Sequence, residues 1–303
     1  MVRRRTGAVA EMPAVLGVPE LGLRDFRLIA AMLNADTGIV LDKAKMPLVQ
    51  ARIAPRIRKL GLRGFAAYCL LLASEAGAAE RMRMREALTT NVTRFFREAH
   101  HFEHLKKVAL PPLLAMARKG ARLRFWSAGC STGEEPYSIA LTILSLMPDA
   151  PRFDIKILAS DVDSNVLSVG RSASYVANSL AYVDDATREK WFVAPTPGTG
   201  LRWSIVQDVR RLVAFRTHNL AGDWPMKGPF QGIFCRNTVI YFDEATRNAI
   251  WSKMQVLLAE GGYLYTGHSE RLPANIDAMR PVGLTIYRKT GGEPNENDEA
   301  RDA

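Results

Sequence analysis

Cysteine is scarce in this sequence, and long hydrophobic runs are missing from it. The three cysteines among 303 residues are Cys69, Cys130 and Cys235. They have neither metal-type nor redox-type spacing, so we expect neither a disulfide framework nor a metal site. No apolar run approaches the roughly 20 residues that cross a bilayer, and the basic N-terminus lacks the apolar segment of a secretory signal. These absences predict a reduced, cytoplasmic protein that is not embedded in a membrane.

Acidic residues are outnumbered by basic ones. The chain has 31 Asp and Glu against 41 Lys and Arg, which gives a formal net charge of +10. Such a charge attracts acidic partners over a long range. Nucleic acid, an anionic membrane surface and an acidic protein all meet that description, so charge does not choose among them. Hydrophobic residues at 48% and charged residues at 24% are ordinary for a globular protein, and the motifs must therefore decide.

Composition shifts along the chain predict five regions. Residues 1–20 contain repeated Gly and Pro and are expected to be a mobile extension. Residues 21–88 place apolar side chains at helical spacing without strand signals, which predicts a small all-α domain. Residues 89–118 follow as a linker and helix. An α/β domain is predicted over 119–290, and the polar, acidic tail 291–303 is expected to be disordered.

Short β-rich runs alternate with helix-compatible segments in the α/β domain. The runs are 123–127, 155–160, 212–216, 230–235, 263–266 and 284–288, and helices are expected at 137–146 and 243–259. This alternation predicts a doubly wound, Rossmann-like parallel sheet. Residues 172–209 interrupt it, and the stretch 192–205, with APTPGTG at its tip, predicts an inserted β-hairpin subdomain.

The segment GCSTGEEPY, residues 129–137, lies between a predicted strand and a predicted helix. Gly129 and Gly133 allow a ligand to approach the backbone closely. Glu134 and Glu135 open the helix, where nucleotide sites usually present an uncovered positive end to phosphate. Two carboxylates would repel phosphate but suit a cofactor with a cationic methionine moiety. The competing interpretation is that both glutamates only complement the helix dipole.

Polar residues also follow two other predicted strands. Asp161 ends the strand in IKILASD, where an acid typically accepts hydrogen bonds from ribose hydroxyls. Asp163 is the alternative ribose ligand, and an Asp that caps the next helix at Ser164-Asn165 is the competing interpretation. Arg236 and Asn237 follow the strand in GIFCRNTVIYFD, and groups at that end of a parallel strand face the ligand crevice.

Six motifs occur in an order that resembles the CheR family of chemotaxis receptor methyltransferases. They are NVTRFFRE from Asn91, GCSTGEEPYS, ASDVD, His218-Asn219-Leu220, CRNTVIYFD and GHSE from Gly267. The resemblance covers about residues 22–289, including the helical domain and the hairpin insertion. One departure is Thr238, where the family usually carries an aliphatic residue.

The resemblance implies a site for S-adenosylmethionine, with S-adenosylhomocysteine as product and no metal. Asn91, Thr93 and Arg97 would reach the cofactor from the linker. Glu135 and Asp161 would hold its amino-acid and ribose parts beside Gly129, although the choice of Glu135 over Glu134 rests on family similarity alone. The remaining implied residues are Asn219 and Leu220 at the adenine, Arg236 and Asn237 in the crevice, and Tyr241 near the methyl group, with Arg97 and Tyr241 in the catalytic role.

The family also implies a substrate, namely glutamate carboxylates in the cytoplasmic helical region of chemoreceptors, which become methyl esters. The basic run Arg52, Arg56, Arg58, Lys59 and Arg63 is either a solvated helix face or a docking face for that acidic receptor. We expect a monomer, recruited to receptor arrays at the membrane. The long APTPGTG tip differs from the compact hairpin of peptide-binding members, which disfavours tethering to a receptor tail.

Two other functions compete with this one. A nucleic-acid methyltransferase fits the charge, but Asn237 is not followed by Pro-Pro-aromatic and no aromatic-interleaved basic stripe is present. A non-catalytic module that senses S-adenosylmethionine is disfavoured by Arg97 and Tyr241. His100 and His104 have metal-type i, i+4 spacing, yet no further ligand pair accompanies them, which favours packing roles.

Overall fold

The computed structural model describes residues 18–89, 93–196, 201–273, 276 and 278–291. The chain divides into two units: the first comprises residues up to Ala35 together with Leu41–Leu88, and the second comprises Asp36–Val40 and the chain from Thr89 onward. The last two residues of the first helix and the three residues that follow it, Asp36–Val40, are therefore part of the second unit. Within the described residues, no helix combines the length and hydrophobicity needed to cross a membrane.

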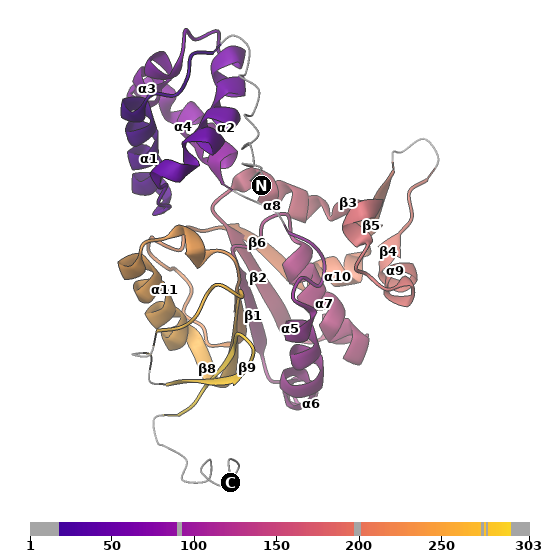
Figure 1. The fold of residues 1–303 in the computed structure, drawn as a ribbon. Coiled ribbons are helices and arrows are strands. Elements are labelled where there is room, and N and C mark those ends of the chain that lie inside the picture. Colours follow the sequence, from indigo (N-terminus) through magenta and orange to yellow (C-terminus); the bar gives the residue numbers. More distant parts are fainter. Residues whose placement is uncertain (1–17, 90–92, 197–200, 274–275, 277, 292–303) are drawn as a thin grey trace, which may run out of the picture. The chain divides into compact units, whose positions relative to one another are not determined.

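The first unit is a helical domain, drawn in indigo and violet in Figure 1. Its helices are α1 (Leu23–Thr37), α2 (Met46–Lys59), α3 (Phe65–Ala73) and α4 (Ala78–Leu88), with 3-10 turns at Lys43–Lys45 and Glu75–Gly77. Side chains at helical spacing, such as Ile29 and Leu33 or Ile53 and Ile57, are fully buried. Gly61 lies just beyond the end of α2 and has φ +64°. Glycine is suited to this position because it adopts the left-handed conformation without steric cost.

The second unit contains a seven-stranded sheet in the order β6-β2-β1-β7-β8-β10-β9. The strands in chain order are β1 (Leu123–Ala128), β2 (Ile155–Asp161), β6 (Val213–Thr217), β7 (Phe230–Cys235), β8 (Leu258–Thr266), β9 (Met279–Gly283) and β10 (Ile286–Lys289). The first five strands of that order pair in parallel, whereas β10 runs antiparallel to both β8 and β9. This confirms the predicted Rossmann-like parallel sheet.

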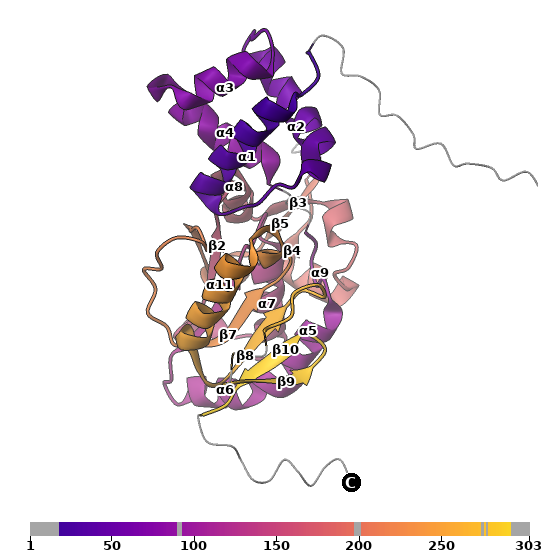
Figure 2. The same cartoon turned by 60° about the vertical axis from the view of Figure 1, so that its left-hand side comes forward.

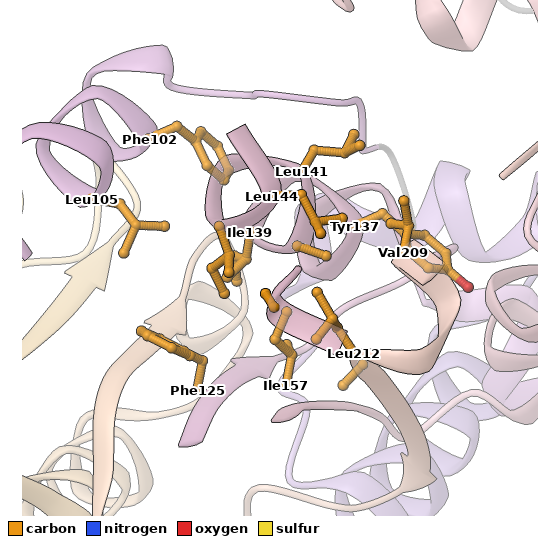
Figure 3. Close-up of a cluster of buried hydrophobic side chains, with 14 of the residues drawn as sticks. Phe102, Leu105, Phe125, Tyr137, Ile139, Leu141, Leu144, Ile157, Val209 and Leu212 are labelled. Atoms are coloured by element: carbon orange, nitrogen blue, oxygen red, sulfur yellow. The ribbon is translucent and has the colours of Figure 1, made fainter. Parts of the chain in front are cut away.

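Helices cover both faces of this sheet (Figures 1 and 2). They are α5 (Ala99–His104), which continues through a π-helical turn (Leu105–Ala109) into α6 (Leu110–Arg118), then α7 (Glu134–Leu146), α8 (Ser164–Ser172), α10 (Gln207–Arg211) and α11 (Glu244–Leu257). Because side chains alternate along a strand, Phe125 of β1 packs toward α7 in one core cluster (Figure 3), and Trp126 packs with Trp251 of α11 in the other. Both faces of β1 are therefore buried.

The insertion after α8 forms a small sheet of its own. Its strands β3 (Ser174–Val176), β4 (Phe192–Val193) and β5 (Arg202–Ile205) pair antiparallel in the order β3-β5-β4, with α9 (Asp185–Trp191) before β4. The predicted hairpin is confirmed as β4 and β5, but the sequence did not predict β3. Part of the predicted tip, residues 197–200, lies outside the described residues.

Two predicted boundaries near the C-terminus were wrong. The helix predicted over 243–259 ends at Leu257, and β8 begins at Leu258 rather than at residue 263. The start of β8 was not predicted because Gly261 and Gly262 interrupt the β-rich pattern. In the structure they lie where the pairing of β8 with β7 is irregular. Strand β9 was not predicted, since it is an edge strand with four exposed residues and a proline.

Candidate active site

The order of the strands places the candidate site at the carboxyl edge of the sheet. Strands β1 and β7 are neighbours, but the chain runs from β1 toward β2 on one side and from β7 toward β8 on the other. Ligands of open α/β sheets bind at such a reversal, beyond the carboxyl ends of the strands. Gly129 directly follows β1, Asp161 ends β2, and Asn219 and Asn237 lie two residues beyond the ends of β6 and β7. The topology therefore brings these predicted residues to one edge of the sheet.

The glycine loop after β1 is tied to the end of β2. The amides of Gly129 and Cys130 donate to the Ser160 carbonyl at 2.8 and 2.9 Å. The Ser131 amide donates to Oδ2 of Asp161 at 2.8 Å. Gly129 has φ +80°, and a Cβ on it would lie 2.2 Å from Oγ1 of Thr238. Glycine is thus required at position 129 for two reasons. The backbone is left-handed there, and the side chain of Thr238, where the family usually has an aliphatic residue, leaves no room for a Cβ.

The two acids after β2 have different tasks. Asp163 is the N-cap of α8, where Oδ1 accepts the Asn165 amide at 2.9 Å. Asp161 instead accepts the amides of Ser131 and Asp163, so it fixes the loop from both sides. Burial raises the pKa of Asp161, and those amide hydrogen bonds offset part of the effect. The helix cap weighed in the sequence is therefore Asp163, which leaves Asp161 as the candidate ribose ligand.

Glu134 and Glu135 differ in a way that the sequence did not reveal. Glu135 accepts from Oγ of Ser127 at 2.6 Å and from Nη1 of Arg236 at 3.1 Å, so each of its oxygens has a protein partner. Glu134 accepts from Oγ1 of Thr132 at 2.6 Å. Burial raises the pKa of both carboxyls. Glu135 is therefore held rigidly beneath the loop, and a ligand amine would meet a carboxylate that is already oriented.

Arg236 has its guanidinium in a buried ion network. Its side chain is 2% exposed, and it contacts Oε2 of Glu98 at 3.3 Å and Oε2 of Glu135 at 3.1 Å. Nη2 donates to the Arg97 carbonyl. Burial alone would raise the pKa of Glu98, but the charge of Arg236 and a 2.9 Å ion pair with His268 hold it below its ordinary value. Arg236 thus joins the linker to β7 and α7.

Glu270 is a buried residue of the site that the sequence analysis did not single out. Its Oε1 accepts the amides of Thr238, Val239 and Ile240 at 2.7, 2.8 and 3.3 Å. Its Oε2 accepts the amides of Asn237 and Gly267 at 2.5 and 2.8 Å. One carboxylate therefore holds the turn between Asn237 and Tyr241. The only sequence signal was its place in the GHSE motif, one of the six that carry the family resemblance.

The linker residues lie between anchored aromatic neighbours. Asn91 is outside the described residues, whereas Thr93 and Arg97 are half-buried. Phe95 is fully buried, with its ring 5.1 Å from Tyr175 and 5.7 Å from Phe192. The Phe96 amide donates to Oγ of Ser138 at 2.9 Å. Phe95 and Phe96 therefore fix the backbone between Thr93 and Arg97, and with it the positions from which these two side chains extend.

The loops after β6 and β7 carry Asn219 and Tyr241. Oδ1 of Asn219 accepts the Ala221 amide at 3.0 Å, which closes the turn before buried Leu220 joins the core beside Val239. Asn237 has a left-handed backbone with φ +55°. Tyr241 ends a 3-10 turn (Val239–Tyr241) and is half-buried.

The histidines His100 and His104 contact different groups, the Leu284 carbonyl and Oη of Tyr265, as packing residues do.

The basic run of the helical unit separates into two sets. Arg56 forms a bidentate ion pair with Glu80, which also accepts from Oη of Tyr68 at 2.9 Å. Nη1 of Arg52 donates to the Leu88 carbonyl at 3.0 Å. Both of these arginines therefore stabilise the helical unit itself. Arg58, Lys59 and Arg63 are exposed and carry the charge that a partner would meet.

The charges around the glycine loop suit S-adenosylmethionine. Glu134, Glu135 and Asp161 surround the loop, and a pyrophosphate would be repelled there. A cofactor with ribose hydroxyls and a cationic amino-acid end meets acceptors instead. The backbone at Gly129 has no Cβ, which permits the close approach that such a ligand needs.

Comparison with known proteins gives the same assignment. Residues 91–288 match the family model described as CheR methyltransferase, SAM binding domain, and residues 24–89 match CheR methyltransferase, all-alpha domain. The chain belongs to the CheR methyltransferase family. It is 49% identical over 260 residues to a probable chemotaxis protein methyltransferase of Rhizobium etli, covering 86% of this chain and 97% of that protein. It is 40% identical over 269 residues to the chemotaxis protein methyltransferase of Escherichia coli, with coverages of 86% and 89%.

A third relative, chemotaxis protein methyltransferase 2 of Pseudomonas aeruginosa, is 39% identical over 266 residues, covering 87% of this chain and 92% of that protein. The resemblance inferred from the motifs is therefore confirmed for the CheR family as a whole. Both predicted domain types, the all-α domain and the S-adenosylmethionine-binding domain, have their own matching models.

Proposed function

We propose that this protein transfers methyl groups from S-adenosylmethionine to glutamate side chains of chemoreceptors, forming methyl esters in chemotactic signalling. Membership of the CheR family makes S-adenosylmethionine-dependent methylation its activity. The observation that supports a protein carboxylate as acceptor is the site itself: Arg97, whose carbonyl accepts from the buried Arg236, would offer a guanidinium to an anionic acceptor. The family match disfavours nucleic-acid methylation and a purely sensory role.

The residues at the carboxyl edge have distinct proposed roles toward the cofactor. Glu135 and Asp161 would accept hydrogen bonds from its amino-acid and ribose groups, and Asn219 and Leu220 would frame the adenine. Asn237 would line the crevice, and Thr93 and Arg97 would approach from the linker. When bound, S-adenosylmethionine supplies an electrophilic methyl group on a sulfonium. Arg236 positions Glu135 and the Arg97 carbonyl through its buried network.

The acceptor carboxylate needs no general base. A glutamate with a pKa of about 4.3 is ionised near neutral pH, so the residues of the site only have to orient it and exclude water. Attack of a carboxylate on a sulfonium cancels charge in the transition state. Donors that grip the carboxylate too tightly would therefore stabilise the ground state more than the transition state. Arg97 and Tyr241 are proposed to align the acceptor.

Replacement of Tyr241 by Phe tests this orienting role. Because no proton moves through the hydroxyl, we expect the methyl-transfer rate at saturating substrates to fall by no more than about tenfold. Cofactor affinity, measured by calorimetry, should stay unchanged. A loss of several orders of magnitude in rate with the same affinity would show that the hydroxyl does more than orient.

The proposed function itself is tested with labelled cofactor and cytoplasmic fragments of receptors. A methyl ester is expected to release its label in mild base, whereas methylated nitrogen or RNA is not. RNA is incubated in a parallel reaction. Label on RNA but not on receptor, or binding of cofactor and product without any transfer, would each refute the proposal. If transfer occurs, mass spectrometry of receptor peptides identifies the modified glutamates.

Docking is proposed to use the exposed cations of the helical unit. The double variant Arg58→Glu/Lys59→Glu should reduce kcat/KM for the receptor fragment by about tenfold or more, because it replaces attraction to an acidic helix with repulsion. Cofactor affinity and thermal stability should not change, since neither residue is buried. The matched control Lys119→Glu/Arg122→Glu reverses two exposed charges in the methyltransferase unit. An equal effect of both variants would mean that only net charge matters.

A further inference from the structure

We propose that Asp36–Val40 is a positioning element of the methyl-transfer site, which fixes the positions of the loops after β6 and β7 relative to each other. This inference rests on the proposed function for its catalytic consequence. The segment comprises the end of α1 and the turn that follows it, and it is grouped with the methyltransferase unit although its neighbours on both sides in the chain belong to the helical unit.

Two hydrogen bonds connect the segment to different site loops. Nδ2 of Asn219 donates to the Asp36 carbonyl at 3.1 Å, while its Oδ1 accepts the Ala221 amide at 3.0 Å. At the other end of the segment, the Val40 amide donates to the Tyr241 carbonyl at 2.8 Å. The segment therefore contacts a proposed adenine-binding residue and the proposed acceptor-aligning residue at once.

Gly38 lies between these two hydrogen bonds and allows the close approach. Its φ is +80°, and a Cβ on it would lie 2.7 Å from Cβ of Ala221 and 3.0 and 3.1 Å from ring carbons of Phe242. Ala221 and Phe242 belong to the same two loops. Any larger residue would push those loops away from the segment or from each other.

Two further side chains of the segment, those of Thr37 and Ile39, are fully or partly buried. Thr37 is 1% exposed. Ile39 packs against the cluster that contains Trp126, Val239 and Phe242. Val40 is 48% exposed, so the segment packs inward at Thr37 and Ile39 and reaches solvent at its end. The segment therefore packs against the methyltransferase unit. It contacts the Tyr241 carbonyl, whereas Glu270 holds the backbone amides of the preceding residues of the same turn.

The decisive variant is Gly38→Ala, with Gly120→Ala as matched control. Gly120 also has a positive φ, +93°, but a Cβ on it would meet nothing within 4 Å. Both variants therefore carry backbone strain, and only Gly38→Ala pushes on the site loops. Amide hydrogen exchange of the peptides that contain Tyr241 and Ala221 should accelerate by about tenfold or more in Gly38→Ala alone. The methyl-transfer rate at saturating cofactor and receptor should fall on the order of tenfold to a hundredfold.

A rescue separates positioning from general destabilisation. Adding Ala221→Gly to Gly38→Ala removes the nearest clashing atom and should restore part of the transfer rate and of the exchange protection. If Gly38→Ala does not fold, Ala221→Val presses on the same contact from the loop side and should give the same pattern. Exchange and transfer rates equal to those of Gly120→Ala would overturn the inference. If the wild-type protein forms no ester, the proposed function fails, but the hydrogen exchange and the cofactor affinity still decide on the positioning role.

Discussion

Replacement of Arg236 by Leu is expected to destabilise the protein by about 3–5 kcal/mol, because it leaves buried carboxylates without their cation. The guanidinium lies between Glu98 and Glu135, and its own side chain is 2% exposed. A leucine supplies neither the charge nor the hydrogen bonds. The free energy of unfolding, obtained from urea denaturation, measures the effect directly. Cofactor affinity should fall as well, since Glu135 loses the partner that orients it.

The loss should depend on pH in a defined direction. In the wild-type protein the pKa of Glu98 is held below its ordinary value, so its ion pair stabilises the fold above the unfolded pKa and ceases to do so as pH falls. Without Arg236, burial dominates and raises the folded-state pKa of both carboxyls. A carboxyl whose folded-state pKa is raised lowers the free energy of unfolding at pH values above its unfolded-state pKa. This destabilisation disappears when the carboxyl is protonated at lower pH. The difference between wild type and variant should therefore be largest above about pH 7 and should narrow toward about pH 5.

The control for this variant is Arg211→Leu, which removes an exposed ion pair with Asp208. Pairs of that kind contribute no more than about 1 kcal/mol. A similar loss in both variants, or a loss from Arg236→Leu that is constant between pH 5 and pH 8, would mean that the network does not stabilise the fold through its charges.

The predictions that succeeded concern features encoded by short stretches of sequence. Buried strands such as 123–127 and 230–235 are short runs rich in aromatic and aliphatic residues, and their positions were correct to within one residue. The Asp163 cap was weighed because Ser164-Asn165 follows it directly. In each case the physical cause, burial or a local hydrogen bond, lies within a few residues of its effect.

The features that were missed depend on contacts between distant segments. The pairing of Arg236 with Glu98 was not predicted, because the two residues are 138 positions apart in the sequence and nothing local indicates it. Strand β3 exists because β5 pairs with it across the insertion. Asp36–Val40 was assigned to the helical domain with the residues around it, whereas its hydrogen bonds join it to the methyltransferase unit. Local periodicity does not report such long-range pairing.

Glu270 is the residue for which this distinction has the largest functional consequence. As an acid in a polar loop it had no special pattern, yet its carboxylate accepts the amides of Asn237, Thr238, Val239, Ile240 and Gly267. Burial raises its pKa, and the amide hydrogen bonds offset part of that effect. Because hydrogen bonds to a charged acceptor are roughly twice as strong as neutral ones, this carboxylate determines the conformation of the turn that ends at Tyr241.

We therefore expect Glu270→Gln to lower the methyl-transfer rate on the order of a hundredfold, equivalent to about 2.7 kcal/mol in the barrier. The Gln side chain places an amide nitrogen against backbone N–H groups, so at least one oxygen's set of hydrogen bonds is lost and the turn moves. Cofactor affinity should fall with the rate, because Asn237 is displaced together with Tyr241. The KM for the receptor fragment should stay near its wild-type value, since the docking cations belong to the helical unit.

The control is Glu260→Gln, which removes the charge of an exposed carboxylate that pairs with Lys289 far from the turn in the sequence. It should leave the rate within about twofold of wild type, because exposed pairs contribute little. Amide hydrogen exchange in the peptide containing Val239 and Ile240 gives a second measurement that does not depend on activity. Unchanged exchange and an unchanged transfer rate in Glu270→Gln would show that the turn keeps its conformation without the carboxylate. The five hydrogen bonds would then stabilise the loop without positioning Tyr241.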